Sequence, residues 1–234
     1  LTLIDPDRVE LHNLDAMNGV TEADIGRFKV EALADTLREI NLATTVMPVP
    51  SGITTMTAFH HAKETDVLLT CVDHDGARMA AAVISTLYQK PLLDIGTGIR
   101  GHGNARHMAG DIRLILPGRC LLCFGGVSRQ DQARAIFLPQ ATVPQPPWNE
   151  QRAGSLLSLN EIAAGIGQRH LEDLVDERIT ASRWTHFESD PQGHFTLTTV
   201  TPPEDPRCPL CRHAGAGDDG IALLRELLPN VLQS

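Results

Sequence analysis

Long apolar runs are missing from this sequence, and none approaches the roughly 20 residues that a helix needs to cross a bilayer. No basic stretch followed by an apolar stretch marks a signal peptide. An excess of positive charge is missing too, since 20 Lys and Arg stand against 29 Asp and Glu, a formal charge of −9. Because binding to nucleic-acid phosphates requires a basic face, this balance argues against such a partner. We therefore expect a cytoplasmic protein that contacts neither membrane nor nucleic acid.

Cysteine is scarce, with five residues, and an odd count without a signal peptide argues against a secreted disulfide scaffold. Four of the cysteines form two CxxC pairs. Each two-residue gap lets both thiolates of a pair face one metal ion, and two pairs complete a closed tetrahedral site typical of structural zinc. Two redox motifs or free thiols are the alternative, but a thioredoxin-like CxxC stands singly at a helix start. The predicted zinc ligands are Cys120, Cys123, Cys208 and Cys211.

Strand-like and helix-like patterns alternate through the first 95 residues. Such alternation predicts βαβ units, and hence an α/β fold with a doubly wound, mostly parallel Rossmann-like sheet. The 42% hydrophobic content is sufficient for one substantial core, so we expect one domain. The spacing of Val30, Leu33, Leu37 and Ile40 predicts the apolar face of one helix. The expected strands are 1–5, 45–49, 67–72, 92–95 and 111–116, and the expected helices are 29–40, 54–63 and 77–88.

The second half of the chain has a different pattern. After an α/β part at 1–123, residues 124–158 are rich in Gln, Arg and Pro and predict a long mobile loop. Residues 159–234 predict a helix, an antiparallel hairpin and a zinc-bound tail. The expected helices are 159–175 and 221–228, and the hairpin strands are 184–188 and 195–200 with a turn at 190–193.

Three charged side chains are expected at the ligand-binding edge of the predicted sheet. Asp5 ends the first strand, where an acid can hold ribose hydroxyls, and Asp73 ends another, where a carboxylate can hold magnesium. Lys29 begins a helix, where its ammonium adds to the helix N-terminus in attracting phosphate. Each residue alone also fits a helix cap or a solvated lysine. Together they favour a nucleotide site.

The run Gly96–Gly101 fits the G-x-G-x-x-G pattern of dinucleotide-binding proteins. That fingerprint requires a helix next, whereas Gly103, Asn104 and another predicted strand follow here. We interpret the run as a tight loop. A nicotinamide-dependent oxidoreductase is therefore the least favoured function.

An ordered series of short motifs runs through nearly the whole chain. Its members are Leu1–Asp7 with Val9, Asn13-Leu14, Asp24–Gly26, Lys29, Cys71–Asp73, Pro117–Arg119, Cys120–Cys123, Gly154–Asn160 and Cys208–Cys211. In this order they resemble the ThiF/MoeB/HesA family, the ubiquitin-activating-enzyme-like adenylyltransferases. The order of the motifs is far more specific than any one of them.

The resemblance implies that the chain is one adenylation domain, spanning 1–234, with a zinc-bound C-terminal part. It implies that the protein uses magnesium and ATP to adenylate the C-terminal carboxylate of a small ubiquitin-like or sulfur-carrier protein, and that it forms a homodimer. Asp5 would hold the ribose, and Asn13 would lie beside the phosphates. Lys29 would contact phosphates and Asp73 would orient magnesium. Arg78 matches a family arginine and joins Lys29 and Asp73 as a predicted catalytic residue.

Two departures from the family pattern bear on activity. The family's glycine-rich loop and the strand before it would precede Leu1, so we expect this sequence to lack them. The family usually has an arginine where Ala16 stands, and that arginine neutralises triphosphate charge. Ala16 therefore favours the alternative of a non-catalytic, zinc-bound binding scaffold with the same fold.

Overall fold

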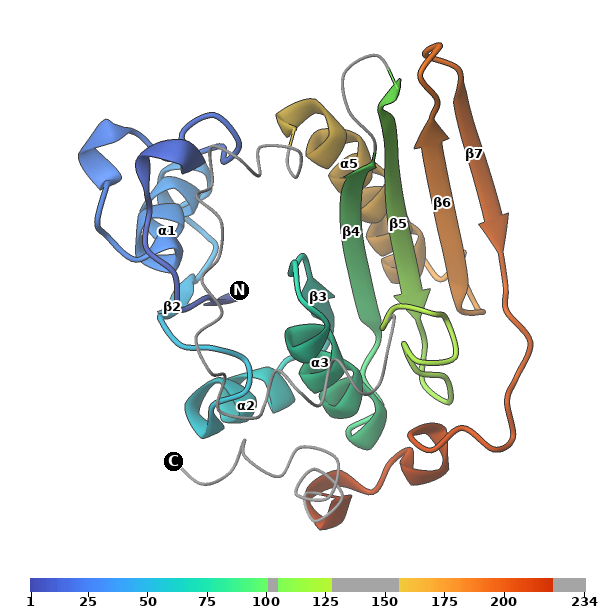
Figure 1. Cartoon of the computed structure of the whole chain (residues 1–234). Helices are drawn as coiled ribbons and strands as arrows, with labels where there is room; N and C mark the ends of the chain where they lie inside the picture. Colours follow the sequence, from blue (N-terminus) through green and yellow to red (C-terminus); the bar gives the residue numbers. More distant parts are fainter. Residues whose placement is uncertain (101–104, 128–155, 221–234) are drawn as a thin grey trace, which may run out of the picture. The chain divides into compact units, whose positions relative to one another are not determined.

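The computed structural model describes residues 1–100, 105–127 and 156–220 (Figure 1). The chain divides into two compact units, which we describe separately. Among the described residues, unit 1 covers Leu1–Thr65 and unit 2 begins at Asp66. No helix in the described part of the chain is both long and apolar enough to span a membrane.

Unit 1 is built on a βαβ arrangement. Strand β1 (Thr2–Ile4) pairs in parallel with β2 (Met47–Val49), and α1 (Lys29–Ile40) lies between them in the sequence. Helix α2 (Met56–Lys63) follows, and the hydroxyl of its N-cap Thr55 accepts a hydrogen bond from a backbone amide in the first turn. Two short 3₁₀ turns, Leu11–Asn13 and Glu22–Asp24, occupy the connection between β1 and α1.

The bounds of α1 match the predicted helix, but its buried face differs from the prediction. Val30, Ala32 and Ala34 are buried, whereas Ile40 is 75% exposed. Ile40 is the last residue of the helix, so no further turn covers its side chain. The small alanines instead allow this face to pack closely.

Unit 2 contains a five-stranded sheet in the order β3-β4-β5-β6-β7. The first pair is parallel, and the remaining three pairs are antiparallel. The α/β class is thus confirmed, and antiparallel pairing extends beyond the predicted hairpin because β5 also runs antiparallel to β4. The strands are β3 (Leu68–Thr70), β4 (Leu92–Arg100), β5 (His107–Ile115), β6 (Arg183–Ser189) and β7 (Phe195–Val200).

Helices α3 (Asp75–Leu87) and α5 (Leu157–Val175) pack on this sheet. Figure 1 shows α5 lying along the face of β4 and β5. Leu93 faces α5, and the next residue, Asp94, pairs with Arg78 of α3, so the two helices cover opposite faces. Buried residues on the α5 side form one hydrophobic cluster: Leu93, Ile112, Leu114, Leu159, Ala163, Ile179 and Phe187.

The glycine run was wrongly predicted as a loop. Residues Gly96 to Arg100 continue β4, and each pairs with a residue of β5. The antiparallel partner supplies the hydrogen bonds that make glycine tolerable in a strand. Gly101, the predicted helix 221–228 and most of the predicted loop 124–158 lie outside the described residues.

Two other strand predictions have different outcomes. The expected buried strand 67–72 is shorter, and its middle residue Leu69 is 53% exposed. Cys71 lies past the end of β3 and is exposed. The hairpin is confirmed as β6 and β7, with Gly193 in the turn at a φ of +84°. A positive φ of this kind favours glycine because it has no Cβ.

Candidate functional site

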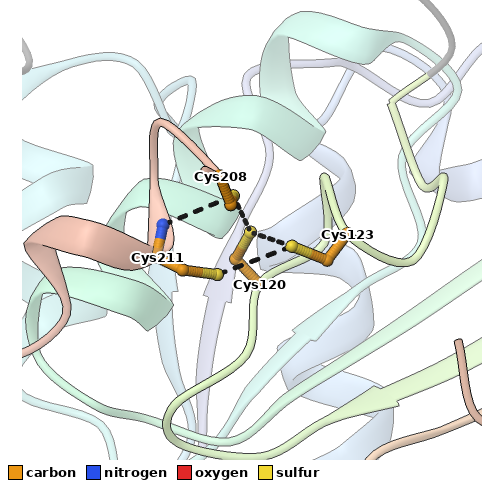
Figure 2. Close-up of side chains that lie close together, drawn as sticks. All are labelled: Cys120, Cys123, Cys208 and Cys211. Carbon is orange, nitrogen blue, oxygen red and sulfur yellow. Dashed lines mark hydrogen bonds between the residues drawn. The ribbon is translucent and has the colours of Figure 1, made fainter. Parts of the chain in front are cut away.

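The four predicted ligand cysteines lie together in unit 2. Cys120 and Cys123 follow β5, while Cys208 and Cys211 lie on the chain beyond β7, and Figure 2 shows their side chains converging. Their sulfur atoms all lie within 4.8 Å of one another. Sγ–Sγ separations are 3.5 Å for Cys120–Cys208, 3.6 Å for Cys123–Cys211 and 3.7 Å for Cys120–Cys123. These separations far exceed the ~2.05 Å of a disulfide.

The same separations suit a tetrahedral metal ion. Zinc–sulfur bonds of about 2.3 Å place tetrahedral sulfurs about 3.8 Å apart, close to the observed spacing. Four sulfur donors match the preference of zinc, and they leave no position open for a substrate. The cluster can therefore hold a metal ion in a closed, structural site.

Without a cation, burial opposes ionisation of the thiols in this cluster. Burial raises the pKa of the Cys120 thiol, and it raises that of Cys211 to about 12. Desolvation is the largest effect on Cys208 too, but hydrogen bonds with the amides of Cys211 and Leu210 and with the thiols of Cys123 and Cys120 together outweigh it and lower that pKa. A bound divalent cation would have the opposite effect, because it stabilises the thiolates directly and so lowers the pKa of the thiols.

The chain around Cys208 and Cys211 is tied to the rest of unit 2 by backbone acceptors. The Arg119 guanidinium donates to the carbonyls of Pro202 and Pro203, at 2.8 and 2.9 Å. Farther on, the amide of Gly215 donates to the carbonyl of Thr86 near the end of α3, at 3.1 Å. The segment following β7 is thus anchored on both sides of the cysteines.

Asp73 lies between β3 and α3 and is exposed. It does not cap the helix, because the N-cap is His74, whose Nδ1 accepts a hydrogen bond from the amide of Ala77 at 3.1 Å. Within the described residues, no hydrogen bond or ion pair engages the Asp73 carboxylate. This carboxylate is therefore available to a cation.

Arg78, in the first turns of α3, pairs with a buried acid. Its Nε lies 3.3 Å from Oδ1 of Asp94, which is fully buried in β4. The Thr70 hydroxyl donates to the same oxygen at 2.8 Å, and Arg113 of β5 lies 3.4 Å from Oδ2. Burial raises the pKa of Asp94, and Arg78, Thr70 and Arg113 act in the opposite direction.

Sequence reasoning missed both Asp94 and Arg113. A signal was present, because Asp94 is the one charged residue in the apolar stretch of β4 that the sequence predicted as a strand. A charge in a buried strand needs a partner of opposite sign, so this acid alone predicts a basic neighbour.

In unit 1, Asp5 and Lys29 are linked through Asp7. The amide of Asp7 donates to Oδ1 of Asp5 at 2.7 Å, and Nζ of Lys29 lies 2.9 Å from Oδ2 of Asp7. The backbone amide of Lys29, the first residue of α1, donates to the Asp7 carbonyl, also at 2.9 Å. Asn13 has a local role, since its Oδ1 accepts from the amide of Glu10 at 2.8 Å.

The predicted nucleotide residues are therefore distributed between the two units. Asp5, Asn13 and Lys29 belong to unit 1, and Asp73 and Arg78 belong to unit 2. Within unit 1, the acid predicted for ribose and the lysine predicted for phosphate share Asp7 as a neighbour. The roles assigned to all five remain predictions.

Comparison with known proteins gives one family match and a set of partial relatives. The sequence model of the ThiF family matches residues 1–210. The adenylyltransferase and sulfurtransferase uba4 of Aspergillus clavatus is 32% identical over 93 residues, which are 40% of this chain and 19% of that protein. The protein of the same name from Lodderomyces elongisporus is 26% identical over 122 residues, 52% of this chain and 26% of that protein.

Solved structures confirm the fold. Escherichia coli MccB crystallised with ATP has a TM-score of 0.63 and 18% sequence identity, and the match covers 90% of this chain and 59% of MccB. MccB with AMPCPP and MccA gives a TM-score of 0.62 at 17% identity, with 90% and 58% covered. This chain therefore spans about three-fifths of those structures and a fifth to a quarter of the curated relatives.

Proposed function

This chain belongs to the ThiF family, and on that premise we propose that it adenylates the C-terminal carboxylate of a small ubiquitin-like or sulfur-carrier protein. The carboxylate oxygen would attack the α-phosphorus of ATP, and the bond from that phosphorus to the bridging oxygen would break. The products are an acyl adenylate and pyrophosphate. The family match over residues 1–210 is the observation that carries this proposal.

The names of the similar proteins support the same class of reaction. The relatives from Aspergillus and Lodderomyces are called adenylyltransferases, and MccB has been crystallised with ATP and with MccA. A small protein or peptide whose carboxylate is activated is therefore the partner we propose. A cytoplasmic location fits such a partner.

Each predicted catalytic side chain has a defined part in this reaction. Asp73 would hold magnesium, which neutralises phosphate charge when bound, and its exposed carboxylate supports this role. Lys29 would bind phosphate oxygens in place of Asp7, while Asp5 would bind ribose hydroxyls. These groups position ATP and stabilise charge.

Ala16 removes one cation from the family's usual set. We expect slow turnover, or help from a cation on a neighbouring subunit. We also propose a homodimer, and the outer side of α5 supports it because Ala164 and Gly165 are exposed there and permit close packing. Light scattering on the complete protein at micromolar concentration should give a dimer mass, and a monomer mass would contradict the proposal.

We propose that the cysteine cluster holds one structural zinc ion. Sulfur spacing, burial and the closed four-sulfur donor set support zinc over an open catalytic metal. Protein purified without chelators should contain one zinc per chain by metal analysis. A preparation that folds normally without zinc would contradict this assignment.

The proposed reaction can be tested by pyrophosphate exchange with the complete protein. The assay would use a panel of small ubiquitin-like and sulfur-carrier proteins with free C-terminal carboxylates. Asp73→Asn should lose most of the exchange rate because magnesium is held poorly. Asp66→Asn is the matched control, since Asp66 is an exposed acid before β3 and Asp73 is an exposed acid after it.

The outcomes separate the leading function from its alternative. Equal exchange in both variants would remove Asp73 from the mechanism. No exchange in the unmodified protein, together with tight binding of a carrier, would favour the non-catalytic scaffold that Ala16 suggests.

A further inference from the structure

Asp94 occupies an unusual position for a charged residue. Its side chain is fully buried within β4, between Leu93 and Ile95, and it faces away from the α5 side of the sheet. Burial of an unpaired carboxylate costs several kcal/mol, so the residue needs strong partners. It has three, one on each neighbouring element: Thr70 of β3, Arg78 of α3 and Arg113 of β5.

We propose that Asp94 is a positioning residue, which fixes the guanidinium of Arg78 so that its terminal nitrogens can bind nucleotide phosphates. The inference rests on the proposed function, because it requires Arg78 to act on ATP. Asp94 itself is fully buried and would not touch the nucleotide.

The geometry of Arg78 supports a held but available guanidinium. Asp94 contacts its Nε, at the inner end of the group, and the Arg78 side chain keeps 18% of its surface exposed. Within the described residues, its terminal nitrogens donate no hydrogen bond to protein. The buried Nε has this ion-pair contact but no hydrogen bond, and the two outer nitrogens are left to bind an anion in bidentate fashion.

The guanidinium of Arg78 lies beside Asp94 and Gly96 of β4, a position that we call the Arg78 seat. A Cβ added at Gly96 would lie 2.3 Å from Nη2 of Arg78, so a glycine is needed for the guanidinium to lie against β4. Gly98 stands two residues along on the same face of the strand, and a Cβ there would meet nothing within 4 Å. Both glycines belong to the run that resembles a phosphate loop in sequence. Of these two, only Gly96 leaves space that Arg78 occupies.

Arg113 links the seat to the cysteine cluster. Its Nε donates to the carbonyl of Phe124 at 3.0 Å, and Phe124 directly follows the ligand Cys123. The same guanidinium contacts Asp94 at 3.4 Å. A continuous series of ion pairs and hydrogen bonds therefore runs from the cysteine loop through Arg113 and Asp94 to Arg78.

The test displaces Arg78 without removing any charge. In the complete protein, Gly96→Ala should push the flexible guanidinium off its seat, and Gly98→Ala is the matched control. Isothermal titration calorimetry would measure the affinity for magnesium-ATP and for adenosine. Gly96→Ala should weaken ATP binding about tenfold, since small displacements of binding groups are costly. It should leave adenosine binding unchanged, because adenosine has no phosphates, and Gly98→Ala should change neither.

A second background distinguishes positioning from a general structural effect. In protein that already carries Arg78→Ala, the further change Gly96→Ala should have no effect on ATP affinity. An equal loss in both backgrounds would overturn the proposal, as would equal ATP affinity of the two glycine variants.

Failure of the proposed function would be seen separately. If the unmodified complete protein bound no ATP, the nucleotide role of Arg78 and this inference would fall together. Thermodynamic coupling between positions 96 and 78 in urea unfolding would then show that the contact exists and that its assigned purpose is wrong.

Discussion

The two units contain ion pairs of similar chemistry in very different surroundings. In unit 1, Lys29 and Asp7 have side chains that are 22% and 64% exposed. In unit 2, Asp94 is 0% and Arg113 6% exposed. An exposed pair contributes little to stability, so a ligand can replace one partner at small cost. Removing one partner of a buried pair is costly, because the charge that remains is then neither paired nor solvated. The exposure of an ion pair therefore distinguishes charges that are suited to ligand binding from charges that stabilise the fold.

Among the buried sites, the cysteine cluster should give the largest loss of stability when it is disrupted. Cys208→Ser should abolish stoichiometric metal binding and lower stability by several kcal/mol, since structural zinc contributes directly to folding free energy. Metal analysis and thermal unfolding would measure both effects. Cys71→Ser is the control, because Cys71 is exposed and outside the cluster. Similar unfolding temperatures for the two variants would refute a structural metal.

Breaking the buried ion pair should rank second. Arg113→Met should cost about 3–5 kcal/mol in urea unfolding, because Asp94 loses a partner and the Phe124 carbonyl loses its donor. Arg169→Met provides the comparison on α5, where the arginine side chain is 59% exposed and also pairs with acids. That variant should lose no more than about 1 kcal/mol. Equal losses would erase the distinction between buried and exposed pairs.

The exposed pair of unit 1 should give the smallest change in stability and a change in binding whose sign depends on the partner removed. Lys29→Met and Asp7→Asn should each alter unfolding free energy by less than about 1 kcal/mol. For magnesium-ATP, calorimetry on the complete protein should show weaker binding by Lys29→Met. Asp7→Asn should bind ATP at least as tightly as the unmodified protein, because the lysine no longer has a competing acid. Weaker binding by both variants would show that the intact pair, rather than Lys29 alone, contacts the nucleotide.

The sequence was most informative where spacing alone determines structure. The bounds of α1 agree with the prediction because its periodic apolar residues and its ends are local features. The two CxxC pairs likewise predicted a four-cysteine cluster, since each pair places its two sulfurs by local geometry and two pairs supply four donors. The turn at Asp190 to Gly193 was equally local, with the glycine at positive φ.

The wrong predictions concern features that depend on tertiary contacts or on where a strand ends. Gly96 and Gly98 indicate a loop when read locally, but β5 pairs with them and draws them into a strand. Cys71 was expected in a buried strand, yet β3 ends at Thr70 and leaves it exposed. The seat of Arg78 combines residues from two strands and a helix, so no window of sequence contains it. Tertiary contacts therefore decided these elements against their local patterns.

If the cysteine cluster holds the proposed zinc ion, its sequence positions imply an order of events during synthesis. Cys120 and Cys208 are 88 positions apart, so the ribosome completes one half of the cluster long before the other. A nascent chain that has passed only the first pair offers two thiolates, and full coordination must wait for the second. Closing a loop of roughly 100 residues with a cross-link removes about 4.7 kcal/mol of unfolded-state entropy in the chain-entropy model. Binding of the proposed zinc should therefore come late, after the strands of the sheet have been synthesised.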